Sequence, residues 1–186
     1  MKKNPNPQGK GLVPVLQSLA ESRALISSTP KQINQISSEL FTSLFILHSQ
    51  FQFKPVVGKR YWLYQRDKQF QLSLISPREW GNDTFGFYVG ECILQPDITW
   101  SLSLDDSAAR NKTLMNYIKN KKIEFEQAMR SAESIDSSLP FYIGELPFYQ
   151  RVFATALANS LKQSMVLSGI QGLSFAQAQK CLSANV

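Results

Sequence analysis

The spacing of hydrophobic residues changes twice along this chain, and the changes divide it into three parts. Between residues 30 and 51, apolar side chains recur every three or four positions, which predicts an amphipathic helix of about five turns. Thr29 and Pro30 predict its cap and its first helical position. The helical stripe consists of Ile33, Ile36, Leu40, Phe41, Leu44, Phe45, Leu47, His48 and Phe51.

In the middle part, from residue 59 to residue 104, apolar and polar side chains alternate, as they do in strands with one covered face. Four runs joined by short connections predict an antiparallel meander of three or four strands. The preceding helix is expected to cover one face, which gives an α+β fold. The residues predicted to share a side in each run are Tyr61 and Leu63; Phe70, Leu72 and Leu74; Phe87, Val89 and Ile93; and Ile98, Trp100, Leu102 and Leu104.

The last part of the chain returns to the spacing of helices. A stripe of apolar residues predicts a helix over residues 112–132, with lysines on its solvent side. Pro147 is placed to open a further helix that ends near Gly169. Ser174 and Gln177 form a capping box for a terminal helix.

These patterns predict a single domain with three segments, since 186 residues of which 43% are hydrophobic suffice for one core without disulfides or metals. The segments are an N-terminal arm over 1–28 with a short helix at 14–26, an α+β core over 29–106, and a helical C-terminal extension over 107–186 that packs on the same core.

Charge and cysteine content exclude few classes of protein function. The net charge of +6 is mildly basic, which favours solubility and anionic contacts without pointing to one partner. Cys92 and Cys181 lie far apart and outside any motif, so a reducing compartment is expected. No stretch reaches the roughly 18 apolar residues of a membrane span, and no signal peptide is evident. We therefore expect a cytoplasmic protein.

One short stretch, SPREWG, interrupts the alternation of the strands. Ser76 suits the N-cap of a helical turn, Pro77 suits the first helical position, and Glu79 can reach back to the Ser76 amide. Gly81 supplies the left-handed residue that ends such a turn, and Trp80 is expected to cap one end of the sheet. Structural roles thus account for this corner, although the same turn would also present side chains to a partner.

The corner and its surroundings resemble a known family. The segment YWLYQRDKQFQLSLISPREWG, followed by GFYVGECILQPDITW, is similar to the core of an uncharacterised family called domain of unknown function 2452. The similarity covers about residues 44–104. It implies no activity, cofactor or catalytic residue. The residues that carry it are Tyr61, Leu63, Tyr64, Ser76, Pro77, Glu79, Trp80, Gly81, Gly90, Leu94, Asp97 and Trp100.

A non-catalytic role in protein interaction is the function that these features favour. We expect self-association into a homodimer, or binding of an unidentified protein, through the open face of the sheet and the corner. The apolar linker around Phe141 and Tyr142 is a second candidate for self-association. The predicted interaction surface consists of Trp62, Tyr64, Arg78, Glu79 and Trp80.

An alternative is a nucleic-acid-binding module. In the predicted hairpin over residues 54–70, basic residues interleave with aromatic ones, which is typical of surfaces that stack single-stranded bases. The predicted contacts would be Lys59, Arg60, Arg66 and Lys68.

A third hypothesis is a small-molecule site or enzyme near Glu79 and Asp97, both of which are expected beside tryptophans at strand ends. His48 is the only histidine and is expected to be packed or at the boundary of the core, while Cys92 is a candidate for a half-exposed thiol. No phosphate-binding loop or dinucleotide fingerprint is present. We therefore expect no cofactor and no metal.

Overall fold

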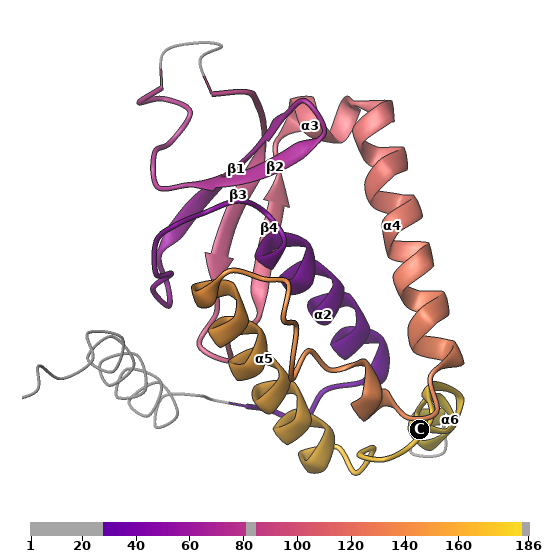
Figure 1. Ribbon diagram of the computed structural model, residues 1–186. Coiled ribbons are helices and arrows are strands. Elements are labelled where there is room, and N and C mark those ends of the chain that lie inside the picture. Colours follow the sequence, from indigo (N-terminus) through magenta and orange to yellow (C-terminus); the bar gives the residue numbers. More distant parts are fainter. Residues whose placement is uncertain (1–27, 81–84, 184–186) are drawn as a thin grey trace, which may run out of the picture.

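The elements follow the predicted order of a helix, strands and further helices (Figure 1). The computed structural model describes residues 28–80 and 85–183, so that the helix predicted over 14–26 and the predicted conformation of Gly81 lie outside the described residues. The elements are α2 (Ile33–Leu47), β1 (Arg60–Arg66), β2 (Gln69–Ser73), β3 (Phe87–Leu94), β4 (Trp100–Leu104), α3 (Asp106–Arg110), α4 (Lys112–Ser131), the 3-10 helix η1 (Ile135–Ser138), α5 (Phe148–Leu167) and α6 (Phe175–Ser183).

The four strands form one antiparallel sheet, which confirms the predicted α+β class. Their order is β2-β1-β3-β4, and it departs from a simple meander because β3 pairs with β1 rather than with β2. β2 and β3 therefore run parallel to each other on either side of β1. A connection between parallel strands must return the chain along the sheet. Residues 74–86, which include the corner, make this return and form a crossover rather than a hairpin turn.

A bulge in β3 changes which side chains face the helices. On β1, Leu63 pairs with Gly90 and the next residue, Tyr64, pairs with Tyr88. Val89 is therefore an extra residue that has no partner of its own on β1. Such an extra residue shifts the alternation of the strand by one position.

This shift explains a wrong prediction. Phe87, Val89 and Ile93 were expected to share the covered side, but Phe87 is exposed and Ile93 is half-buried. Val89 and Cys92 are both fully buried instead. The half-exposed thiol predicted for Cys92 is thus also wrong, because strict alternation does not allow for the bulge.

α2 is shorter than the predicted five-turn helix at both ends. It begins at Ile33 with Gln32 as the N-cap, whereas Thr29 and Pro30 lie before it. The reason is a long-range contact at Lys31, whose backbone N–H donates to Ser168 Oγ at 2.7 Å, while the same hydroxyl donates to the Lys31 carbonyl at 2.9 Å. In a helix that began at Pro30, the Lys31 carbonyl would accept a helical bond, and here it accepts from Ser168 instead.

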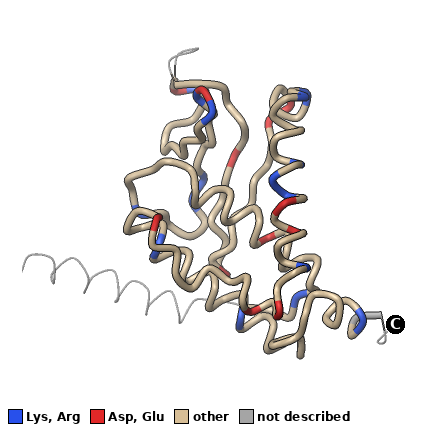
Figure 2. The backbone as a smooth tube through the Cα atoms, turned by 45° about the vertical axis from the view of Figure 1, so that its right-hand side comes forward, with Lys and Arg blue, Asp and Glu red and all other residues tan. Residues whose placement is uncertain are grey.

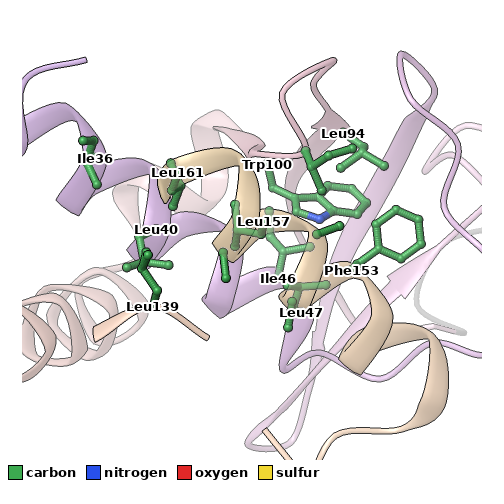
Figure 3. Packing of buried hydrophobic residues seen from close by; sticks show 14 of the residues in the cluster. Ile36, Leu40, Ile46, Leu47, Leu94, Trp100, Leu139, Phe153, Leu157 and Leu161 are labelled. Carbon is green, nitrogen blue, oxygen red and sulfur yellow. The ribbon is translucent and has the colours of Figure 1, made fainter. Parts of the chain in front are cut away.

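The main core lies between α2, α5 and one face of the sheet. Figure 3 shows side chains of α2 and α5 meeting those of β3 and β4, with Trp100 and Phe153 close together. Trp100 also donates its backbone N–H to Ser43 of α2 at 2.9 Å, which ties the edge strand β4 to the helix. The buried residues labelled in the figure are Ile36, Leu40, Ile46, Leu47, Leu94, Trp100, Leu139, Phe153, Leu157 and Leu161.

The C-terminal helices agree with the sequence predictions. Pro147 is the N-cap of α5, and Gly169 follows the helix with a φ of 68°. The predicted capping box is present, since the Ser174 N–H donates to Gln177 Oε1 at 2.8 Å and the Gln177 N–H donates to Ser174 Oγ at 3.3 Å. None of the helices in residues 28–80 and 85–183 has the length and apolarity needed to cross a membrane.

Candidate functional site

The crossover begins with the turn that the sequence predicted. The Ser76 N–H and Oγ–H donate to Glu79 Oε2 at 2.9 and 2.8 Å, so the predicted reach of Glu79 back to the Ser76 amide is confirmed. The N–H groups of Glu79 and Trp80 donate to the Ser76 carbonyl at 3.0 and 3.1 Å. The bond from the Ser76 amide lowers the pKa of Glu79. Glu79 is therefore held as a capping anion rather than as a proton donor.

A row of aromatic rings fixes the crossover to the outer face of the sheet. Trp80 stacks on Phe85 with ring centres 4.5 Å apart, and Phe85 meets Tyr64 edge to face at 5.2 Å. Tyr64 also contacts Tyr88 at 5.6 Å and donates its hydroxyl proton to the Ile75 carbonyl at 3.1 Å. These contacts leave Tyr64 buried, and burial raises its pKa. Tyr64 therefore offers little surface to a partner, while Trp62 on the same face remains half-buried.

A cleft of about 360 Å³ opens between the crossover, the outer edge of β2 and the segment that follows α2. Its volume is at the lower end of the range for small ligand sites. Leu74 at its wall is 53% exposed, which is unusual for a leucine that the sequence placed on the covered side of β2. The lining consists of Gln50, Phe51, Gln52, Phe53, Gln71, Leu72, Ser73, Leu74, Ile75, Trp80 and Phe85. None of these residues is charged.

The basic residues of the hairpin do not converge. Arg60 and Arg66 are the first and last residues of β1, and six residue steps along a strand span about 20 Å. Lys59 lies at the Arg60 end and Lys68 at the Arg66 end, and Arg60 is paired with Glu91 at 3.5 Å. Figure 2 shows acidic and basic segments interspersed along the described chain. This geometry provides no continuous basic track across the first hairpin.

The most buried charged group is Lys31, whose side chain is 4% exposed. Its ammonium donates to Glu39 at 2.5 Å and to Asp97, and Asp97 Oδ1 accepts from the Thr99 N–H and hydroxyl at 3.1 and 2.6 Å. Burial opposes the charged form of Lys31, but the bonds to Asp97 and Glu39 outweigh it and raise the pKa. The amine thus stays protonated at neutral pH and is unsuited to act as a nucleophile.

The other candidate groups for catalysis lie apart. Glu79 is bound to Ser76 and Asp97 to Lys31, so each carboxylate is held by a different partner. Burial raises the pKa of the Cys92 thiol, which makes it unreactive. No group of three or more potential metal ligands occurs in the described part of the chain.

His48 was predicted to be packed or at the boundary of the core. That prediction is wrong, because the side chain is exposed. It caps the C-terminus of α2, where its Nδ1 lies 2.7 Å from the Leu44 carbonyl oxygen. The helix ends at Leu47, four residues before the end of the predicted apolar stripe, and His48 is turned out to solvent. No second histidine exists to form a pair with it.

Two features escaped the sequence analysis. Lys31 meets carboxylates that are 8 and 66 positions away, a spacing that no local pattern reveals. The cleft depends on the divergence of two segments that are adjacent only in space. The sequence feature that could have indicated the cleft is the pair of apolar residues Leu74 and Ile75 at the start of a long connection.

Comparisons with known proteins support the family and nothing more specific. A family model described as "Protein of unknown function (DUF2452)" matches residues 23–121, which is just over half of the chain. The matched range includes α2, the whole sheet and the first half of α4. A search of curated proteins found no match, and neither did a search of solved structures.

Proposed function

This chain belongs to the DUF2452 family, whose function is unknown, and we propose that it is a non-catalytic protein-interaction module that self-associates. The proposal is supported by a group of exposed aromatic side chains next to α5. Tyr142 is 87% exposed, and Phe141 and Phe148 are also exposed. Aromatic residues of this kind are enriched at protein interfaces. We call Phe141, Tyr142 and Phe148 the aromatic patch.

The aromatic patch lies along the outer face of one helix. Phe148 is in the first turn of α5, and Phe141 lies over the next turns, since Thr155 Oγ1 donates to its carbonyl at 3.2 Å and Lys162 Nζ lies 5.7 Å from its ring. Residues 148, 155 and 162 are seven apart and therefore share one side of a helix. The side chain of Val166 continues this side to the end of α5 and is exposed as well.

A face of this kind suits a second copy of the same chain. In a two-fold dimer each residue of the interface meets the partner copy of the same surface. If two copies of α5 pack antiparallel, the aromatic patch of one copy meets the C-terminal end of α5 in the other. That end exposes Val166 and Leu167, so the contact would be apolar at both ends. Self-association would thus cover side chains that a monomer leaves in water.

Size-exclusion chromatography with light scattering tests this proposal. We expect the purified chain to have twice its 21.0 kDa mass at both low and high salt, because apolar contacts are not screened by ions. Replacing Tyr142 and Phe148 together by serine should give the monomer mass. As a matched control, Val56 and Val57 form an exposed apolar pair elsewhere, and replacing both by serine should leave the dimer intact. A monomeric wild-type chain would refute self-association.

A cytoplasmic location is part of the same proposal. Cys92 and Cys181 are both free thiols, one buried and one exposed, which is typical of proteins from a reducing compartment. The separation of the basic residues at the two ends of β1 gives no comparable support to nucleic-acid binding.

A further inference from the structure

The cleft beside β2 lies where a sheet edge loses its backbone partner. The Gln50 N–H donates to the Phe70 carbonyl at 2.8 Å, and the Leu72 N–H donates to the Gln50 carbonyl at 3.0 Å. The next bonds of such a parallel ladder would join Gln52 to the Leu72 carbonyl and to the Leu74 N–H. No hydrogen bond joins these groups, because the segment that contains Gln52 diverges from the end of β2, and the cleft lies between the two.

The backbone at this edge is directed outward. The Leu72 N–H faces away from β1, and since β2 remains a strand through Ser73, the next N–H on this side belongs to Leu74, the first residue of the bend that follows. An edge with free N–H and C=O groups is a template for a further strand. The Leu72 carbonyl and the Leu74 N–H therefore supply one acceptor and one donor in the cleft.

One residue that lines the cleft also carries a buried polar group without a partner. The indole Nε1 of Trp80 is buried and makes no hydrogen bond within the described residues, although Trp80 lines the cleft. A buried donor without an acceptor destabilises the protein unless a ligand or water satisfies it. A carbonyl oxygen is the acceptor that suits an uncharged indole N–H. The ring of Trp80 is held in place by its stack on Phe85, so the donor is fixed in direction.

The lining also limits the chemistry of the occupant. Phe51, Phe53 and Phe85 provide apolar walls, and no cation is present among the lining residues to bind a phosphate. Two positions before Trp80, Arg78 is exposed and makes no ion pair with any described residue, whereas Glu79 next to it is bound to Ser76. The cleft therefore fits a neutral segment, and its rim fits a negative charge.

We propose that the outer edge of β2 receives an extended, uncharged segment of a partner protein as an added strand, flanked on the partner by an acidic residue that pairs with Arg78. The added strand accepts from the Leu74 N–H, donates to the Leu72 carbonyl and offers a carbonyl to Trp80 Nε1, and its apolar side chains contact the aromatic walls. The cleft shares no lining residue with the aromatic patch on α5, so binding there does not require self-association.

A peptide titration tests the proposal with the full chain. The probe is a blocked, fluorescein-labelled peptide of alternating threonine and valine that ends in two aspartates, and its binding is followed by fluorescence anisotropy. A second peptide carries N-methyl groups on alternate amides, which keeps the side chains but removes the donors of a strand. A third peptide ends in two lysines. We expect the first peptide to bind and the N-methylated peptide to bind at least about tenfold more weakly. The peptide that ends in lysines should bind more weakly than the first peptide at low salt only, because salt screens the charges.

Two variants assign the binding to the cleft. Trp80→Phe keeps an aromatic ring, although a smaller one, but removes Nε1–H, and it should weaken binding about 3–10-fold. The matched control is Trp62→Phe, which removes an indole N–H on β1 away from the lining and should leave binding unchanged. Leu74→Pro removes the edge N–H at an exposed position and should weaken binding further. If that variant fails to fold, the chemical-shift change of the Leu74 backbone amide proton on titration of the wild type tests the same edge.

The proposal is wrong if no peptide binds, if N-methylation has no effect, or if Trp80→Phe and Leu74→Pro both bind like the wild type. It is also wrong if Leu74→Pro lowers the oligomeric mass while peptides do not bind, because the edge would then be occupied by a second copy. Loss of the dimer in the aromatic-patch variant with unchanged peptide binding would leave the cleft proposal intact.

Discussion

Replacing Lys31 by methionine is expected to destabilise this protein more than any other single loss of charge in the described residues. The substitution keeps much of the side-chain volume but removes the ammonium that Asp97 and Glu39 share. Asp97 is 15% exposed and Glu39 is 25% exposed, so each would be left partly buried without its cation. Lys31 also lies where α2 approaches the β3–β4 turn, which its bond to Asp97 ties together.

The magnitude follows from burial. Removing one partner of a fully buried ion pair costs about 3–5 kcal/mol of unfolding free energy. Here Asp97 keeps its two bonds from Thr99 and both carboxylates retain some water, so we expect about 2–4 kcal/mol. In a chain of this length that loss corresponds to a fall in Tm of about 5–15 °C. Glu39→Gln removes the more exposed partner and should cost only about 1 kcal/mol.

The pH dependence distinguishes this explanation from a packing defect. Burial alone would raise the pKa of Asp97, but the bonds from Lys31 and Thr99 outweigh it, so the folded pKa is lowered. Such a carboxylate stabilises the fold above its unfolded pKa of about 3.9, and the stabilisation is lost as the pH falls through the folded pKa. Lys31→Met lacks the part of this stabilisation that Lys31 supplies at every pH, while the bonds from Thr99 remain. The difference between wild type and variant should therefore narrow below about pH 4.

Urea unfolding followed by tryptophan fluorescence, at pH 7 and at pH 3–4, measures both effects. Glu39→Gln serves as the control for loss of a charge at the less buried carboxylate. The reasoning fails if Lys31→Met is as stable as the wild type within about 0.5 kcal/mol, or if its deficit is the same at both pH values.

Three further predictions test the sheet, the core thiol and the corner. Gly90→Ala should lower the unfolding free energy measured in urea by at least about 2 kcal/mol or prevent folding, because a Cβ there would lie 2.3 Å from the Ser103 carbonyl oxygen. A stable variant would contradict the close approach of β3 and β4. In a dithionitrobenzoate assay Cys181 should react at once and Cys92 only on unfolding, and rapid reaction of both thiols would refute the burial of Cys92. Ser76→Ala should lower the unfolding free energy by only about 0.5–1 kcal/mol, and a loss beyond about 2 kcal/mol would mean that the turn organises more of the fold than its exposed bonds suggest.

The elements that sequence reasoning predicted correctly depend on local chemistry. Pro147 at the start of α5, the capping box at Ser174 and the bond from Ser76 to Glu79 each involve residues at most three positions apart. Helical periodicity likewise needs only the residues of one helix. Such patterns can be recognised from neighbouring residues alone, and tertiary packing did not override them in these elements.

The features that sequence reasoning missed depend on contacts between distant residues. The bulge at Val89 shifts the alternation of β3 by one position, and nothing in the residues around it distinguishes it from an ordinary strand. The start of α2 is set by Ser168, which is 137 positions away from Lys31. Periodicity could indicate a helix in this region but not the residue at which distant bonds interrupt it.

The strand order accounts for both the surface that the sequence predicted and the site that it did not. Because β3 pairs with β1 and runs parallel to β2, the chain must return past β1, and Ile75 and Phe85 contact Tyr64 on the outer face of the sheet. That return places Phe85 over Tyr64, which removes a predicted contact residue from the surface. The same return carries the chain away from the outer edge of β2 after Leu72, so the edge stays open beside Trp80. A sheet with the order of a simple meander would pair β3 with that edge and leave no cleft, so a partner strand at β2 depends on this strand order.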